Sequence, residues 1–146
     1  MEVREVSFDE LGGVLDLIDQ FDRVISPRPS SDSLQSIFKQ IKASGGAIIG
    51  VFAAGKILGT CTVNLCANLS WSGRPYAIIE NVVVDSSHRG KGIGTAILHF
   101  AKKFAEESGC YKVALMTGSK RPETLRFYEN AGFSGTKIGF QKRFSA

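Results

Sequence analysis

The residues whose types and spacing most clearly suggest chemistry are three glycines and two cations at the junction of a strand pattern and a helix pattern. Residues 80–98 read ENVVVDSSHRGKGIGTAIL, so an apolar run leads into the glycines and an apolar helical pattern follows them. The first amides of a helix have no acceptor within it, and the positive end of its dipole favours anions. The residues that could form a phosphate or pyrophosphate site on this basis are Arg89, Gly90, Lys91, Gly92 and Gly94. A glycine loop that serves only for tight turning is the alternative, but it leaves the two cations unexplained.

Two familiar nucleotide motifs do not fit this glycine cluster. A P-loop would need glycine at Asp85 and serine or threonine at Gly92. A dinucleotide fingerprint would need glycine or alanine at Thr95 or Ile97, and residues 111–117 hold no acidic side chain for a ribose. Both classes of nucleotide site are therefore excluded.

The elements around the cluster alternate between helix and strand patterns. Ser7 and Glu10 have capping-box spacing before a helical pattern that runs to Phe21. A second helix is predicted on residues 34–41 and is closed by Gly45 and Gly46. Strands 47–54 and 57–66 follow, joined at Gly55-Lys56, and a long connection, 67–76, leads to strand 77–84. The remaining predictions are a helix from 93 ended by Ser108-Gly109, strand 110–117, a helix from Pro122 to a stop at Gly132, and one or two final strands in the tail. This order predicts an α/β or α+β fold with a mixed sheet.

At this point the chain resembles a known family. Residues 89–94, RGKGIG, fit the [QR]-x-x-G-x-[GA] motif of the acetyl-CoA-dependent N-acetyltransferase superfamily called GNAT. Residues 125–133, LRFYENAGF, resemble its second signature, and the resemblance covers nearly the whole chain. It implies a mixed, mostly antiparallel central sheet flanked by helices, in which two parallel strands splay apart to bind coenzyme A.

The resemblance also implies a coenzyme A site. The pyrophosphate would lie on backbone amides of Arg89, Gly90, Lys91, Gly92, Ile93, Gly94 and Thr95. The pantetheine arm would lie along Val82, Val83 and Val84, and the Val82 N–H would meet the oxyanion. Where many relatives carry an asparagine that contacts the pantetheine, this chain has Thr124, whose hydroxyl replaces only part of an amide's bonding.

Two side chains are candidates for proton transfer in the direct acetyl transfer that the resemblance implies. Glu80 is the one carboxylate in its strand, and strict alternation places it on the face of Ile78 and Val82. It could accept a proton from the amine, or it could be a structural carboxylate bonded to nearby backbone. Tyr128 matches the position that donates to the leaving sulfur, and a core tyrosine is the alternative.

The acceptor is left open by the sequence. IENVVV, its spacing to RGKGIG, and GCYKV followed by FYENAGF are most similar to glucosamine-6-phosphate N-acetyltransferases, although Asn81 stands where those enzymes usually carry aspartate. Arg28, Trp71 and Arg74 lie in loops and could bind an anionic small-molecule amine. Another small amine, such as an amino acid or a polyamine, is an alternative. So are a protein N-terminus and a non-catalytic coenzyme A-binding module.

Length and composition limit the remaining possibilities. A chain of 146 residues predicts a single domain, residues 1–146. A net charge of +4 spread over short clusters favours a small polyanionic partner over nucleic acid. The charged N-terminus and short apolar runs predict a cytoplasmic protein without a membrane partner.

The cysteines and the tail lead to two further expectations. Cys61, Cys66 and Cys110 have no zinc spacing with the histidines, so we expect packing residues and no metal. The resemblance makes a homodimer plausible, because residues 137–144 could add to a neighbouring sheet edge.

Overall fold

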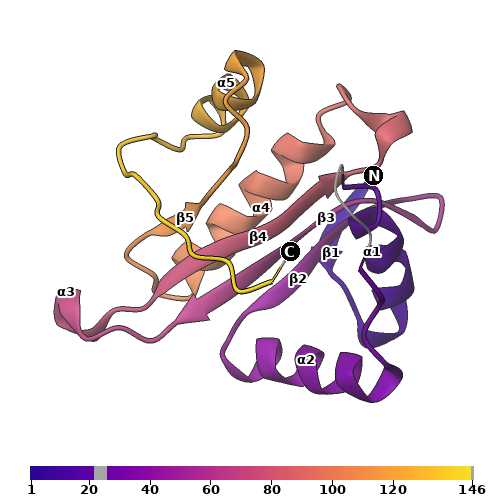
Figure 1. Cartoon of the computed structure of the whole chain (residues 1–146), viewed down its shortest axis with the longest axis horizontal. Coiled ribbons are helices and arrows are strands. Elements are labelled where there is room, and N and C mark those ends of the chain that lie inside the picture. Colours follow the sequence, from indigo (N-terminus) through magenta and orange to yellow (C-terminus); the bar gives the residue numbers. More distant parts are fainter. Residues whose placement is uncertain (22–25, 146) are drawn as a thin grey trace. The chain divides into compact units, whose positions relative to one another are not determined.

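The computed structural model describes residues 1–21 and 26–145, in two compact units that we treat separately. Unit 1 spans Met1–Leu115 and unit 2 spans Met116–Ala146 (Figure 1). In unit 1 the elements are β1 (Glu2–Glu5), η1 (Phe8–Glu10), α1 (Leu11–Ile18), α2 (Ser31–Ala43), β2 (Ala47–Ala53), β3 (Lys56–Cys66), α3 (Ser70–Gly73), β4 (Tyr76–Val84), η2 (Ser86–His88), α4 (Ile93–Glu107) and β5 (Val113–Leu115). Unit 2 contains α5 (Pro122–Asn130). No helix in the described part of the chain is long and apolar enough to cross a bilayer.

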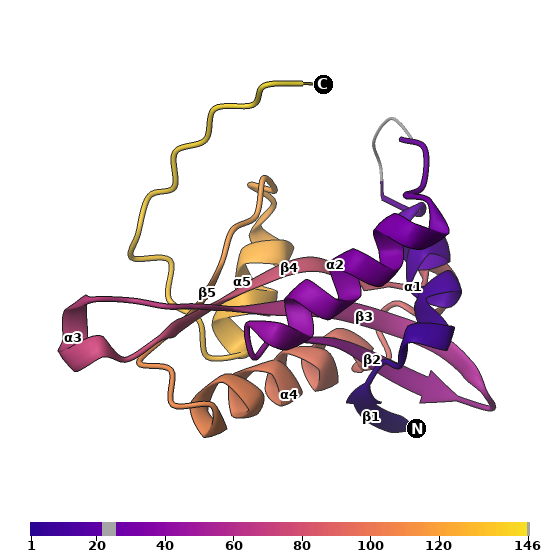
Figure 2. The same ribbon diagram turned by 90° about the horizontal axis from the view of Figure 1, so that it is seen from below.

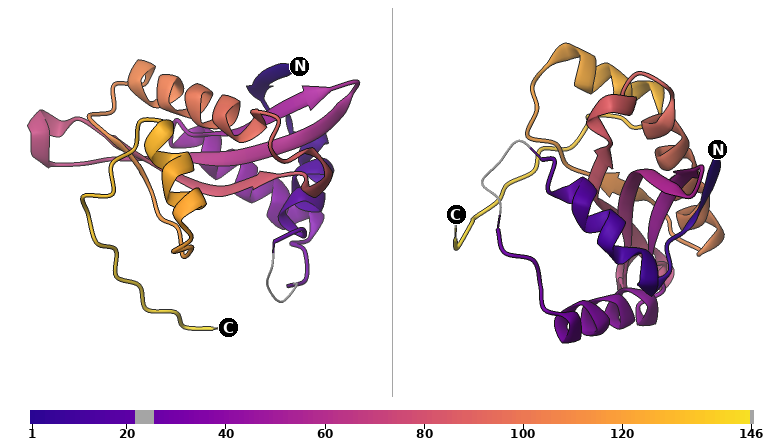
Figure 3. Two further views of the ribbon diagram at one scale, coloured as in Figure 1. Left: turned by 90° about the horizontal axis from the view of Figure 1, so that it is seen from above. Right: turned by 90° about the vertical axis from the view of Figure 1, so that its right-hand side faces the viewer.

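The centre of unit 1 is a five-stranded sheet in the order β1-β2-β3-β4-β5. Neighbouring strands are antiparallel except for β4 and β5, which are parallel. Figure 2 shows α4 on one face of this sheet and α1 with α2 on the other, and the left view of Figure 3 shows α4 on the same face. The predicted mixed, mostly antiparallel sheet flanked by helices is therefore confirmed.

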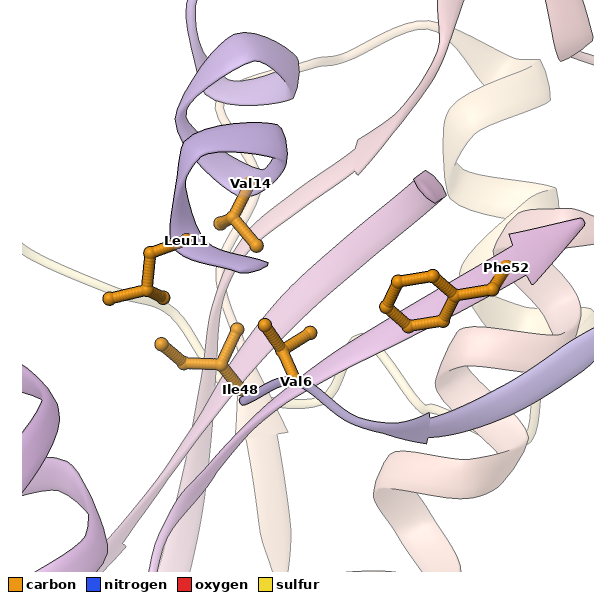
Figure 4. Close-up of a cluster of buried hydrophobic side chains, with 5 residues drawn as sticks. All are labelled: Val6, Leu11, Val14, Ile48 and Phe52. Carbon is orange, nitrogen blue, oxygen red and sulfur yellow. The ribbon is translucent and has the colours of Figure 1, made fainter. Parts of the chain in front are cut away.

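Each face of the sheet buries its own apolar cluster. On the α4 side, Ile49, Val63 and Ile79 are at most 2% exposed, as are Ile97 and Leu98 of the helix. Burying a large aliphatic side chain contributes about 1.5–3 kcal/mol to folding stability, so this layer fixes α4, including its first turn, against the sheet. The second cluster lies under α1 and consists of Val6, Leu11, Val14, Ile48 and Phe52 (Figure 4).

A β-bulge interrupts β4 next to its carboxylate. Glu80 pairs with Thr62, and Val83 pairs with Thr60. Thr60 and Thr62 share a face of β3, so Glu80 and Val83 share that face although they are three positions apart in the sequence. The prediction that Glu80 lies on the same face as Ile78 and Val82 is therefore confirmed only for Ile78, which pairs with Asn64. It is wrong for Val82, because the extra residue of the bulge reverses the alternation after Glu80.

Several boundaries differ from the predictions. The capping-box prediction is confirmed by the Ser7 N–H, which donates to Glu10 Oε1 at 2.9 Å, but α1 ends at Ile18 rather than at Phe21. The hairpin turn lies on Ala54 and Gly55, one residue earlier than predicted, because both adopt positive φ and so match a type I′ turn. The strand predicted at 110–117 is confirmed only for β5.

The two ends of the chain depart furthest from the predictions. β1 has no strand pattern in the sequence, because its residues EVRE carry three charges around one valine; it pairs at the sheet edge with β2. The final strands predicted for the tail are wrong for the described residues, since 133–145 form none. A strand requires a paired neighbour, and glycines at 132, 135 and 139 weaken the strand preference of this segment.

Candidate active site

The glycine loop between β4 and α4 presents an open backbone surface. Gly90 and Gly92 adopt φ values of 75° and 80°, which side chains rarely accept. A Cβ at either position would meet nothing within 4 Å. Gly92 is the N-cap of α4, and no side chain caps the helix. The first amides of α4 therefore face a space that can receive an anion.

Two cations stand beside this surface without a competing partner. Arg89 and Lys91 are exposed, and neither side chain makes an ion pair or hydrogen bond with the residues that the structure describes. Their charge adds to that of the helix terminus. The loop can thus hold a pyrophosphate with backbone donors and two mobile cations, which fits the predicted coenzyme A residues 89–95.

A hydrogen-bonded clamp that was not predicted from the sequence fixes the turn before the glycines. The Gln20 side chain donates to Asp85 at 3.0 Å and accepts from the Ser86 N–H at 2.9 Å. Hydrogen bonds from Ser87, Gln20 and His88 hold the pKa of the Asp85 carboxyl well below its usual range. No local pattern indicates this clamp, because 65 residues separate Gln20 from Asp85.

The edge of β4 beyond its first residues is left free by β5. Parallel pairing covers only Ala77–Ile79 against Val113–Leu115, and β5 ends there. Residues 80–84 therefore have no β5 partner, so the backbone of Val82, Val83 and Val84 is open to a ligand that can accept and donate hydrogen bonds. This is the arrangement expected of two parallel strands that separate.

Glu80 is an uncommitted carboxylate at the start of this free edge. Its side chain is exposed and makes no hydrogen bond or ion pair within residues 1–21 and 26–145. The structural role considered from the sequence, a carboxylate bonded to nearby backbone, therefore has no observed contact. The next residue, Asn81, has a φ of 55°, and such strained positions often mark functional sites.

A groove of about 440 Å³ opens beside Glu80 between α1, α2 and the sheet. This volume lies within the range of about 300–1,000 Å³ that is typical of small-molecule sites. Its polar wall is formed by Thr62 and Asn64 of β3 with Glu80 and Asn81 of β4. An amine bound in the groove could therefore reach the free carboxylate.

The three predicted acceptor residues are not brought together. Arg28 is held by Asp16 and Asp19, each at 2.7 Å, which raises the pKa of its guanidinium. Trp71 stacks on Tyr111 with ring centroids 5.4 Å apart, in the connection that includes α3.

The α3 connection lies away from the carboxylate. Arg74 donates to the Cys110 carbonyl at 3.3 Å. This connection meets the sheet at Tyr76, four residues before Glu80, or roughly 13 Å along β4. Trp71 and Arg74 thus stay predictions without observed proximity to Glu80.

In unit 2, Tyr128 lies in an aromatic cluster on α5. Its ring centroid is 5.0 Å from that of Phe127 and 6.5 Å from that of Phe133. Burial raises the pKa of the Tyr128 hydroxyl, so this group is protonated at neutral pH and can donate. The Thr124 hydroxyl accepts a hydrogen bond from Ser119 at 3.1 Å and keeps its own proton for donation.

The cysteines have the environment of packing residues. Burial raises the pKa of the Cys61 thiol to about 12, and burial also raises the pKa of Cys110. Nucleophilic attack requires the thiolate, so Cys61 is a poor nucleophile at neutral pH. In the described residues, no cluster of three or more His, Cys, Asp or Glu side chains is placed to hold a metal ion.

Comparison with known proteins agrees with this geometry. The acetyltransferase (GNAT) family matches residues 14–133. A glucosamine 6-phosphate N-acetyltransferase from Trypanosoma brucei brucei is 31% identical over 136 residues, covering 91% of this chain and 88% of that protein. The crystal structure of the Arabidopsis thaliana glucosamine-6-phosphate N-acetyltransferase matches with a TM-score of 0.86 and 27% identity, covering 99% of this chain and 98% of that one. The chain therefore belongs to the acetyltransferase (GNAT) family and is an N-acetyltransferase.

Proposed function

We propose that this N-acetyltransferase moves the acetyl group of acetyl-CoA directly to the primary amine of a small molecule, as one domain comprising residues 1–146. The observation that carries the proposal is the free carboxylate of Glu80, which lies at a groove and on the strand that leads into the glycine loop. Acceptor groove, free strand edge and anion site thus follow one another along unit 1.

Acetyl-CoA is the proposed co-substrate, and it supplies an activated acyl carbon with a thiolate leaving group. The open loop at Gly90 and Gly92, with uncapped helix amides and unpaired cations, supports pyrophosphate binding by residues 89–95. The free edge at Val82–Val84 supports backbone pairing with the amides of the pantetheine arm. The Val82 N–H is the proposed donor to the developing oxyanion. Thr124 is the proposed further contact to the arm.

Glu80 is the proposed general base. Removing the proton from an amine with a pKa of about 10.4 costs roughly 4–5 kcal/mol at pH 7, whereas an amine near pKa 7.8 costs only about 1 kcal/mol. The carboxylate takes the amine proton directly or through water and passes it to solvent. As the C–N bond forms, the C–S bond breaks, and the sulfur takes a proton. Tyr128 is the proposed donor of that proton, which its raised pKa supports.

The class of acceptor is supported by the relatives. Two relatives, at 31% and 29% identity, are named for acetylation of glucosamine 6-phosphate, a small primary amine. Arg28, Trp71 and Arg74 remain proposed acceptor contacts, although Arg28 would first have to leave two carboxylates.

Location and assembly are further proposals. Cys61, Cys66 and Cys110 are all free thiols, which supports a cytoplasmic location because that compartment keeps thiols reduced. Exposed Ile138, Phe140 and Phe144 in the tail support a homodimer in which tails add to a sheet edge. Light scattering at micromolar concentration tests the homodimer, and a monomer would contradict it.

Steady-state thiol release from acetyl-CoA, measured with a panel of small amines, tests the proposed activity. Release that depends on the amine and yields the N-acetyl product is the expected result. Coenzyme A binding seen by calorimetry, without release for any amine, would refute the transferase proposal and leave only binding.

A further inference from the structure

We infer that the acceptor is a primary amine on an uncharged apolar body, such as an alkylamine or an arylalkylamine, rather than an amino-sugar phosphate. This inference rests on the proposed function and names the substrate class of the same site. It is carried by the walls of the groove beside Glu80, whose described residues combine one carboxylate with a large apolar surface.

Most of this apolar surface comes from the two helices that cover this face of the sheet. α2 contributes Leu34, Ile37, Phe38 and Ile41, which recur on one side of the helix. α1 adds residues that include Leu15 and Ile18. None of the α2 residues is buried, and Ile37 remains 44% exposed. An apolar helix face that is turned to the sheet but only partly covered leaves area for an apolar ligand.

The charge around the groove points the same way. Glu80 is the one ionisable residue among the described residues that line it, so an ammonium finds a partner there and a phosphate does not. Two of the three described cations that are next in sequence to lining residues are already paired. Arg28, beside Pro29, is held by Asp16 and Asp19, and Lys42, beside Ile41, is held by Glu5.

The remaining cation of α2, Lys39, lies on the side of the helix that faces away from the groove. At about 100° per residue, Lys39 falls on the side of the helix opposite the lining positions 34, 37, 38 and 41. A phosphate placed in the groove would therefore lose its hydration without gaining a charged donor from these walls. An apolar group has no comparable hydration to lose, and its transfer from water into the groove is favourable.

Two matched series of acceptors test the inference. Within each series the amino group is the same, and only the rest of the molecule changes. The first is propylamine, butylamine, pentylamine and hexylamine, for which we expect kcat/KM to rise about fourfold per methylene. The second is glucosamine against glucosamine 6-phosphate, for which we expect no gain from the phosphate beyond twofold. A flat alkyl series, or a phosphate gain above tenfold, would overturn the inference while leaving the transferase function standing.

A pair of variants on α2 tests the position of the groove. Ile37→Lys places a cation on the lining face and is expected to lower kcat/KM for hexylamine at least tenfold. Ser36→Lys places the same cation on an exposed residue of the opposite face and is expected to change it by less than twofold. Equal losses in both variants would contradict the assignment.

Calorimetry with coenzyme A distinguishes failure of the proposed transferase function from failure of the inference about the acceptor. Both variants are expected to bind coenzyme A with the wild-type Kd, which shows that they are folded. If wild-type protein binds coenzyme A and acetylates no amine of either series or of the wider panel, the proposed function fails, and this inference fails with it. If it acetylates only the sugar phosphate, the inference alone fails.

Discussion

Replacing Gly92 by alanine should weaken coenzyme A binding far more than it destabilises the fold. The chain supplies a matched control at the other end of the same helix. Gly92 and Gly109 flank α4 with φ values of 80° and 84°, and a Cβ at either position meets nothing within 4 Å. The two substitutions therefore impose the same backbone strain without a steric clash, and only one of them lies at the proposed anion site.

The stability cost can be worked out from the backbone. A left-handed conformation costs a non-glycine residue about 1–2 kcal/mol, and the stiffer unfolded chain returns about 0.4–1 kcal/mol. Each variant should thus lose about 1 kcal/mol of unfolding free energy in urea titrations. At position 92 the new methyl group also enters the open space over the helix amides. Losing one charged hydrogen bond there costs about 1.5–3 kcal/mol, or roughly ten- to hundredfold in Kd.

Isothermal calorimetry with coenzyme A, together with urea unfolding, measures both quantities on the same samples. We expect the Kd of Gly92→Ala to rise at least tenfold and that of Gly109→Ala to stay within twofold of wild type. If Gly92→Ala binds coenzyme A normally, the pyrophosphate does not lie on these amides. If Gly109→Ala binds as poorly as Gly92→Ala, general loosening of α4 explains the effect.

Three further outcomes are expected. Glu80→Gln should lower kcat/KM for an alkylamine at pH 7 by about 10²- to 10³-fold and flatten its pH profile, whereas an unchanged profile would remove Glu80 as base. Tyr128→Phe should lower kcat about tenfold or more without changing the Kd of coenzyme A, and an unchanged kcat would make Tyr128 a packing residue. Hydrogen bonds from Arg4 and Ser7 lower the pKa of Glu10 from 4.5 to about 2. The resulting stabilisation is complete above pH 4.5 and is lost as pH falls towards 2. Urea unfolding of wild type should show this loss, and Glu10→Gln should show less of it.

Patterns that are local in sequence predicted most of the elements that position the site. The glycines and the apolar periodicity that follows them correctly predicted a glycine loop between a strand and a helix. The strand that carries Glu80 was also predicted, because its apolar run is continuous. These patterns can be recognised in the sequence because each depends only on residues that are neighbours along the chain.

What the sequence could not predict depends on contacts between distant residues. One left-handed residue, Asn81, changes the face on which Val82 lies, and the residue type alone, although asparagine is enriched in that conformation, does not predict a bulge there. The EVRE strand is too charged to be recognised without its partner β2. The tail showed strand-like residues, but a strand also needs a paired edge, which residue types cannot supply.

The Gln20 clamp has a consequence for how the two substrates would affect each other. It joins the turn after α1, a helix that lines the groove beside Glu80, to the turn that leads into the glycine loop. A ligand that shifted α1 would, through these hydrogen bonds, also shift that turn. Thermodynamic reciprocity then requires that acceptor and coenzyme A change each other's Kd by the same factor. Removing the Gln20 side chain would bring that shared factor towards one, even though Gln20 is not among the residues that line the groove.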